Sequence, residues 1–166
     1  MTRQEPLCLR VWFYDPRSDP HGVVNKVVAA LDGPFCHCEV QFPDAVAFSV
    51  YMGSRVVCKA RGFDPARYTC VRVPCSRNDL SAARQCAEER MRVPQTFSLS
   101  QMVCALAPGA WQTAASADGT FCSKLVAEVL VKAHALPSDT NTQGVTPSGL
   151  YRLMHTRFVE GKGAAI

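Results

Sequence analysis

Two alternating segments, separated by a tight turn, constrain the fold more than any other feature of the sequence. Residues 36–42 read CHCEVQF and residues 46–52 read VAFSVYM, so each segment has an apolar side chain at every second position. Residues 43–45, Pro-Asp-Ala, are typical of a turn. A shift of one residue would move every apolar side chain of a strand to the other face. We therefore predict an antiparallel hairpin in which Phe42 pairs with Val46.

We predict that one face of this hairpin is polar and the other belongs to the core. The predicted register places Glu39 opposite Ser49 and His37 opposite Tyr51. Ser49 is then a diagonal neighbour of His37, within reach of a long or bridged contact. The core face carries Cys36, Cys38, Val40, Phe42, Val46, Phe48, Val50 and Met52.

The rest of the chain supplies further strands and several helices. Strands are predicted over residues 7–14, 55–59 and 68–73, and helices over residues 23–31, 76–93, 98–106, 122–135 and 149–154. The order is one strand, one helix, a four-stranded meander and then helices. This order predicts an α+β domain, with an antiparallel sheet of about four to five strands packed against helices. We expect a single domain over residues 1–160 and a frayed tail over residues 161–166.

Composition indicates a reducing compartment and disfavours several classes of protein. The 166 residues include nine cysteines without a Cys-x-x-Cys pair, so a zinc site of the usual spacing is not expected. The net charge is +4, and no basic run predicts nucleic-acid binding. No stretch is long enough to span a membrane, and the first residues lack a signal-peptide core. We expect a cytoplasmic protein (host cytoplasm if the gene is viral) without a cofactor or metal; the sequence leaves its oligomeric state open.

Cys122 stands at the predicted start of an amphipathic helix. Asp118-Gly119 signals a turn, and from Leu125 the apolar residues recur with helical spacing. The unpaired backbone N–H groups and the dipole of a helix N-terminus favour a thiolate there and lower its pKa. By counting alone, any one of nine cysteines is more often a small residue of the core.

A nucleophilic thiol needs a base within hydrogen-bond reach, and the chain has four histidines. His37 is the only one on a predicted strand, with polar neighbours on its face. His21 lies in a loop with two prolines, and His155 lies near the end of the chain. His134 lies three turns from Cys122, where we expect it to cap helix carbonyls.

The base in turn needs a group that orients it. Glu39 and Ser49 are the candidates, although residues two apart on one strand lie about 7 Å from each other. A metal site at residues 36–38 is not expected, because alternation sends the imidazole to the opposite face from the two thiols. A group of basic side chains is interpreted as solvated surface rather than as a substrate rim: Lys59, Arg61, Arg67 and Arg72.

Four short stretches together resemble the circularly permuted NlpC-like branch of the papain-like thiol hydrolases. They are CHCEVQFPD at 36–44, AFS at 47–49, FCSKLV at 121–126 and VTPSGLY at 145–151. The last is similar to a segment of phage and large-virus members. The branch includes lecithin-retinol-acyltransferase-like enzymes. Their sites combine a His, a second polar residue about a dozen positions later and a Cys near a helix start.

The resemblance implies a permuted papain-like fold and assigns roles to residues. Cys122 would be the nucleophile, and His37 would act first as base and then as acid. Ser49 stands where many relatives carry His, Glu, Gln or Asn, so the orienting group is either Ser49 or Glu39. The backbone N–H of Cys122 would form part of an oxyanion hole, with Tyr14 as a candidate side-chain donor.

The function expected from these residues is that of a cysteine hydrolase. It would cleave an amide or isopeptide bond of a protein or peptide substrate through a Cys–His acyl-enzyme mechanism. Two alternatives stay open. The chain could be an acyltransferase or thioesterase for a lipid-like acyl substrate, or a catalytically silent binding module.

Overall fold

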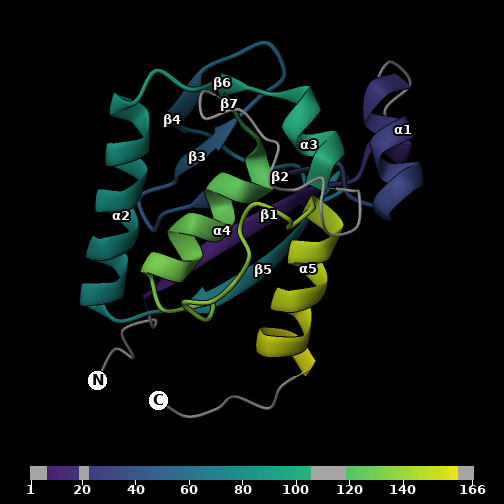
Figure 1. The fold of residues 1–166 in the computed structure, drawn as a ribbon. Coiled ribbons are helices and arrows are strands. Elements are labelled where there is room, and N and C mark those ends of the chain that lie inside the picture. The colour runs from purple at the N-terminus through teal and green to yellow at the C-terminus, as the bar shows by residue number, and fades with distance from the viewer. Residues whose placement is uncertain (1–6, 19–22, 106–118, 161–166) are drawn as a thin grey trace.

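A five-stranded antiparallel sheet forms one layer of the fold. The computed structural model describes residues 7–18, 23–105 and 119–160 (Figure 1). The strands are β1 (Cys8–Tyr14), β2 (His37–Gln41), β3 (Val46–Val50), β4 (Val56–Ala60) and β5 (Tyr68–Pro74). Their order across the sheet is β4-β3-β2-β1-β5, with every neighbouring pair antiparallel. The α+β class with an antiparallel sheet, predicted from the sequence, is confirmed.

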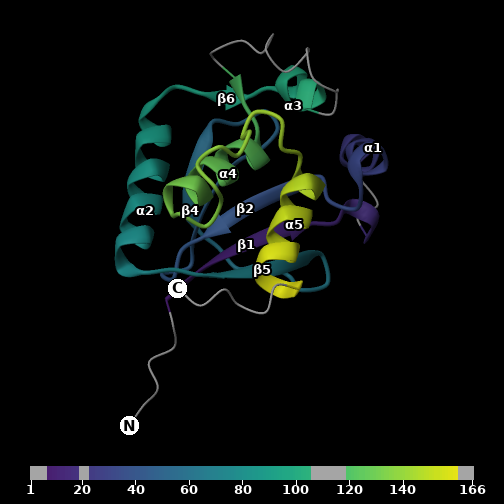
Figure 2. The same cartoon turned by 60° about the horizontal axis from the view of Figure 1, so that its bottom comes forward.

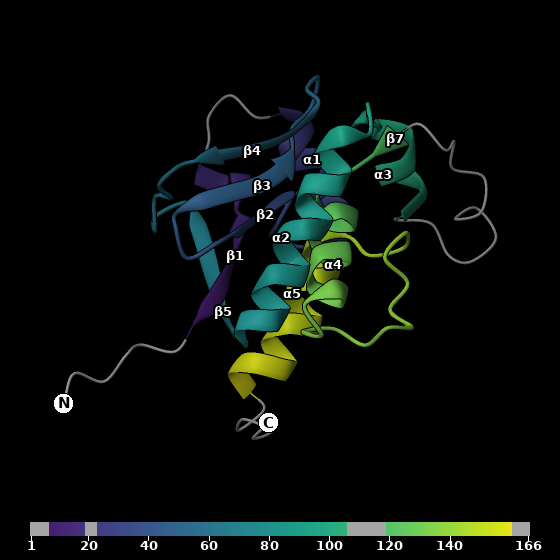
Figure 3. The ribbon, with the colours of Figure 1, turned by 90° about the vertical axis from the view of Figure 1, so that its left-hand side faces the viewer.

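Helices form the second layer. They are α1 (Val23–Asp32), α2 (Arg77–Arg92), α3 (Leu99–Ala105), α4 (Cys122–Lys132) and α5 (Pro147–His155). Three of them, α2, α4 and α5, lie on one face of the sheet (Figure 3), and α4 lies between the other two (Figure 2). A small parallel sheet of β6 (Thr96–Phe97) and β7 (Gly119–Thr120) was not predicted, because two residues give no periodic pattern.

The hairpin of β2 and β3 has the predicted register. Phe42 N–H donates to the carbonyl of Val46 at 2.8 Å, and Val40 pairs with Phe48. The apolar side chains of both strands enter the core, with two exceptions: Val46, next to the turn, is only half-buried, and Met52 is exposed. Met52 was predicted to be in the core but is 52% exposed, because β3 ends two residues earlier and Met52 belongs to the turn into β4.

The predicted meander is correct for β2, β3 and β4 and wrong for β5. This strand pairs with β1 at the opposite edge of the sheet, where Val71 faces Val11. Otherwise β1 would be an edge strand with unpaired backbone groups. Residues 61–67 must therefore cross from one edge of the sheet to the other. They carry Phe63, which stacks on Trp12 with ring centroids 4.7 Å apart and an interplanar angle of 9°.

The central helix α4 connects the sheet to the other helices. Leu125 and Leu130 are fully buried among the apolar side chains of the core. Glu128 forms an ion pair with Arg90 of α2 at 2.9 Å. The helix ends at Lys132, earlier than the predicted 135, and its first residue is Cys122, as predicted.

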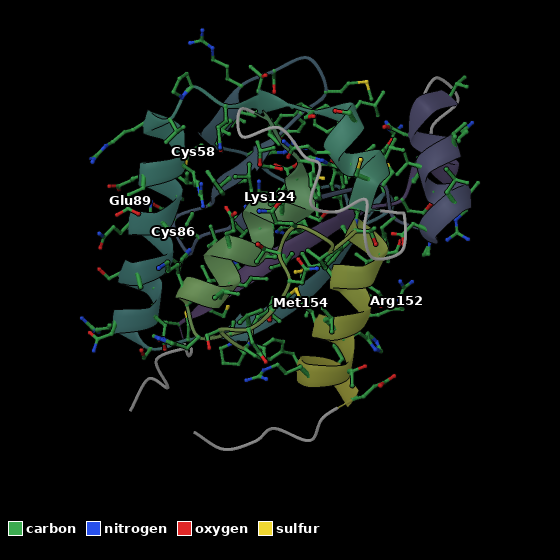
Figure 4. All side chains as sticks on the ribbon, viewed as in Figure 1. Cys58, Cys86, Glu89, Lys124, Arg152 and Met154 are labelled. Atoms are coloured by element: carbon green, nitrogen blue, oxygen red, sulfur yellow. The ribbon has the colours of Figure 1, made fainter. Side chains whose placement is uncertain are left out.

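The last helix ties the second layer to the sheet and to α1. Thr146 caps α5 by accepting a hydrogen bond from Gly149 N–H at 3.0 Å, and the helix begins two residues before the predicted 149. Met154 is fully buried against the sheet, and Arg152 reaches toward α1, where it donates to the carbonyl of Asp32 (Figure 4). The predicted frayed tail, 161–166, lies outside the described residues. Among the described residues, every helix is too short or too polar to cross a lipid bilayer.

The close approach of β7 to the start of α3 requires a glycine three residues before Cys122. A Cβ atom added at Gly119 would lie 2.5 Å from the Cβ of Ser98. We therefore expect Gly119→Ala to destabilise the fold by about 1–3 kcal/mol through overpacking. Urea denaturation of Gly119→Ala and of Gly62→Ala measures the effect, since a Cβ at Gly62 would meet nothing within 4 Å. Equal midpoints for the two variants would contradict the expectation.

Candidate active site

Cys122 lies at the first position of α4 and faces a cavity. Its side chain is almost completely buried, and the cavity that it lines has a volume of about 480 Å³. Phe121, at the N-cap, supplies no side-chain acceptor to the unpaired N–H groups of the first turn. Ser123 anchors that turn by donating to the carbonyl of Val145 at 2.8 Å. The sulfur thus lies at the positive end of a fixed helix and within reach of a small molecule.

His37 lies beside Cys122 because it is the first residue of β2, at the end of the strand where α4 begins. Burial alone would lower the pKa of His37. The negative charge of the Cys122 thiolate, a hydrogen bond to it and the Glu39 carboxylate together raise the pKa of His37 to about 9. The imidazole is therefore protonated at neutral pH.

The pKa of Cys122 is shifted in the opposite direction. A hydrogen bond from the Cys38 thiol lowers the pKa of Cys122, burial opposes that effect, and the positive charge of His37 lowers the pKa further. Burial and the nearby Cys122 thiolate raise the pKa of Cys38, so Cys38 keeps its proton and acts as the donor. The two shifts favour a thiolate–imidazolium ion pair between Cys122 and His37.

Glu39 lies on the other side of His37. Its Oε1 lies 3.5 Å from Nε2 of His37, which is long for a hydrogen bond but short for an electrostatic contact. Tyr51 donates to Oε2 at 2.6 Å and Arg61 donates to Oε1 at 2.8 Å. Burial would raise the pKa of Glu39, but these contacts with His37, Tyr51 and Arg61 outweigh it and lower the pKa. The carboxylate is therefore a charged and fixed partner of the imidazole.

The structure does not bring Ser49 to His37. Ser49 is fully buried, and its hydroxyl donates to the carbonyl of Cys38 at 2.8 Å. The cross-strand register is as predicted, but the hydroxyl is too short to reach beyond the neighbouring backbone. Of the two predicted orienting residues, only Glu39 contacts His37.

The other histidines lie elsewhere or have other partners. His134 was expected to cap helix carbonyls, but its Nδ1 contacts Asp79 at 2.9 Å. His155 lies 3.3 Å from Glu160 in an ion-pair contact. His21 lies outside the described residues. Over the residues that the structure describes, no three His, Cys, Asp or Glu side chains gather as a metal site.

Three residues of the site were not selected from the sequence. Cys38 was placed in the core, and its contact with the thiol of Cys122 depends on where α4 packs. Tyr51 was predicted to lie opposite His37, and its ring lies 4.9 Å from the imidazole. Nothing in the sequence indicated its hydrogen bond to Glu39. Arg61 was interpreted as solvated surface. Its side chain is only 26% exposed, because the crossover of residues 61–67 folds it over the sheet.

Tyr14, the candidate oxyanion donor, lines the same cavity as Cys122. The remaining cavity wall is mostly apolar or aromatic, and it includes Val23, Val28, Cys36, Met52, Tyr68, Phe97 and Met102. Comparisons with models of protein families, with curated proteins and with solved structures found no match. The resemblance to permuted papain-like hydrolases therefore remains a prediction.

The ion pair predicts how Cys122 reacts with an alkylating agent. Iodoacetamide should modify Cys122 at about pH 6, well below the pKa of about 8.5 of a free thiol, because the pKa of Cys122 is lowered. Cys75 is the internal control, since burial raises the pKa of its thiol. His37→Gln should raise the pKa of Cys122 and slow its alkylation at that pH. Peptide mass spectrometry over a pH series measures both residues.

Two outcomes of this experiment would contradict an activated thiol. Cys122 could alkylate with the same pH dependence as Cys75, or it could fail to react in the folded protein. Either result would favour the silent binding module over an enzyme.

Proposed function

We propose that this chain is a cysteine hydrolase that acts on a carbonyl substrate through an acyl-enzyme. The observation that supports the proposal is the contact between Cys122 and His37 at the wall of a cavity. A thiolate paired with an imidazolium is both the nucleophile and the acid that such a reaction needs. Glu39 on the far side of the imidazole supplies the third, orienting group.

The proposed reaction begins with the attack of the Cys122 thiolate on the carbonyl carbon. Negative charge then develops on the carbonyl oxygen, and the N–H groups at the start of α4 are placed to stabilise it. His37 gives its proton to the leaving nitrogen as the carbon–nitrogen bond breaks, which leaves a thioester on Cys122. A water molecule then attacks the thioester while His37 takes its proton. Expulsion of the thiolate restores the ion pair.

The first candidate for the bond cleaved is an amide or isopeptide bond. Its nitrogen is a poor leaving group unless it is protonated, and the raised pKa of His37, about 9, keeps that proton available at neutral pH. A protein or peptide would then be the substrate.

The cavity favours a second candidate, in which the acyl group is apolar. Val28, Phe97 and Met102 lie in its wall, and none of the described residues in that wall is a Lys, Arg, Asp or Glu. Such a wall suits a hydrocarbon chain better than a charged peptide side chain. Transfer of an acyl group from a thioester or ester would use the same Cys122 and His37 steps.

The proposed chemistry predicts the effect of removing the two central residues. Cys122→Ala should abolish activity, and His37→Ala should lower kcat by about 10²–10⁴ because the general acid and base is lost. The assay is a panel of amide, isopeptide, thioester and ester substrates. Cys75→Ala is the matched control, since Cys75 lies at the opposite end of the sheet from His37. If Cys122→Ala were as active as the parent protein, the proposal would be wrong.

The second candidate has a test of its own. Val28 is buried in the cavity wall, whereas Val27, its neighbour on α1, is 54% exposed and does not line the cavity. Val28→Phe should reduce turnover of long acyl thioesters relative to acetyl thioesters by narrowing the cavity, and Val27→Phe should leave that ratio unchanged. Competition between acyl chain lengths in one assay gives the ratio. An unchanged ratio in Val28→Phe would exclude this cavity as the acyl site.

A further inference from the structure

A half-buried polar network surrounds the Glu39 carboxylate next to His37. Arg61 is at its centre. One guanidinium nitrogen, Nη1, donates both to Oε1 of Glu39 at 2.8 Å and to the hydroxyl of Tyr51 at 2.6 Å. The other, Nη2, donates to the hydroxyl of Tyr68 at 3.3 Å. Through one arginine, the network connects β2, β5 and the residue after β3 to the crossover.

Arg61 and His37 approach the same oxygen of Glu39. Arg61 lies 2.8 Å from Oε1, at hydrogen-bond distance, whereas Nε2 of His37 lies 3.5 Å from it. Tyr51 holds the second oxygen, Oε2, at 2.6 Å. The carboxylate is thus bound more tightly to Arg61 and Tyr51 than to His37, and its position is fixed without the imidazole.

Aromatic rings keep the guanidinium in this place. It lies 4.6 Å from the ring centroid of Phe63 and 5.7 Å from that of Tyr68. Phe63 is itself stacked on Trp12 of β1. A surface arginine seldom has its side chain restricted in this way, and the restriction lowers the entropy cost of its hydrogen bonds.

We propose that Arg61 and Tyr51 are positioning residues of the active site, which hold Glu39 and draw its negative charge away from His37. This inference rests on the proposed function, because it concerns the acid and base of that reaction. A carboxylate that paired fully with the imidazolium would hold the proton that His37 must release to the leaving group. Sharing the carboxylate with Arg61 leaves His37 oriented and still able to give up its proton.

The inference predicts that the pKa of His37 changes in opposite directions when either partner of the Arg61–Glu39 ion pair is replaced. Arg61→Gln removes a positive charge and leaves Glu39 to interact with His37 alone, so the pKa of His37 should rise. Glu39→Gln removes the negative charge, so the pKa of His37 should fall. Tyr51→Phe keeps the ring and removes one donor to Glu39, so it should raise the pKa of His37 by less.

Other groups that face His37 stay in place in these variants. They are Cys36 just before β2, Cys38 of β2, Tyr14 of β1 and Tyr68 of β5, with Lys59 of β4 beyond the ring of Tyr51. Cys122 of α4 also lies beside His37 and is alanine in every variant compared.

NMR titration of the His37 imidazole in the full chain tests the inference. Every variant is made in a Cys122→Ala background, so that the thiolate does not contribute and no turnover is needed. We expect a rise of about one pH unit for Arg61→Gln and a fall of about one unit for Glu39→Gln. Arg61→Lys keeps the positive charge, so its His37 pKa should lie between those of Arg61→Gln and the Cys122→Ala parent. Arg67→Gln is the matched control, because Arg67 lies on the same crossover with an exposed partner, Asp64.

The outcomes separate this inference from the proposed function. No shift, or a shift in the same direction for Arg61→Gln and Glu39→Gln, would overturn the inference even if the chain is an active hydrolase. Opposite shifts in a chain that turns over no substrate would support the network and reject the hydrolase. In the active parent, Arg61→Gln should also move the alkaline limb of kcat/KM to higher pH. If Arg61→Gln fails to fold, Arg61→Lys and Tyr51→Phe decide the question: a rise of the His37 pKa supports the inference, and a fall or no change overturns it.

Discussion

The burial of the Glu39 carboxylate is the constraint on which the rest of the site depends. A charge with 1% of its side chain exposed must have partners, because removal from water costs several kcal/mol per ion. Those partners are His37 of β2, Tyr51 directly after β3, and Arg61 of the crossover after β4. The crossover passes over Glu39 only because β5 pairs with β1 at the far edge of the sheet. The strand order is therefore a requirement of the site as well as of the core.

The Cys122 thiolate is a second buried charge, and it too needs partners that stabilise it. It lies at the start of α4, receives a hydrogen bond from Cys38 and faces the imidazolium of His37. With Arg61 and Glu39 included, two negative and two positive groups form a chain of alternating charge. Such a chain has no net charge, which makes its burial tolerable where a single charge would not be.

Local patterns in the sequence were sufficient to predict the strands and helices that have a clear apolar periodicity. The alternation in residues 36–42 predicted the hairpin register, and the helical spacing of the apolar residues from Leu125 predicted α4. The turn predicted at Asp118-Gly119 was wrong at Gly119, which belongs to β7, and Asp118 lies outside the described residues. The position of β5 could not be predicted, because the same apolar strand can pair with either free edge of a sheet. The position of Arg61 depends on which edge β5 pairs with, so it could not be predicted either. Ser49 lies in the predicted register but does not contact His37, for another reason. Register gives the neighbours of a residue, but the length of its side chain decides which of them it reaches.

The carboxylate that contacts the His37 imidazole thus lies on the strand of His37 itself, rather than on the next strand. Residues two apart on a strand are separated by about 7 Å at their backbones, and this spacing alone disfavours a contact between His37 and Glu39. The long side chains of His37 and Glu39 close that gap to 3.5 Å, because Arg61 and Tyr51 fix the carboxylate. Removing one charge of the chain leaves the other three unbalanced in a buried site. The four residues must therefore act as a unit, so the effects of their substitutions will not be additive.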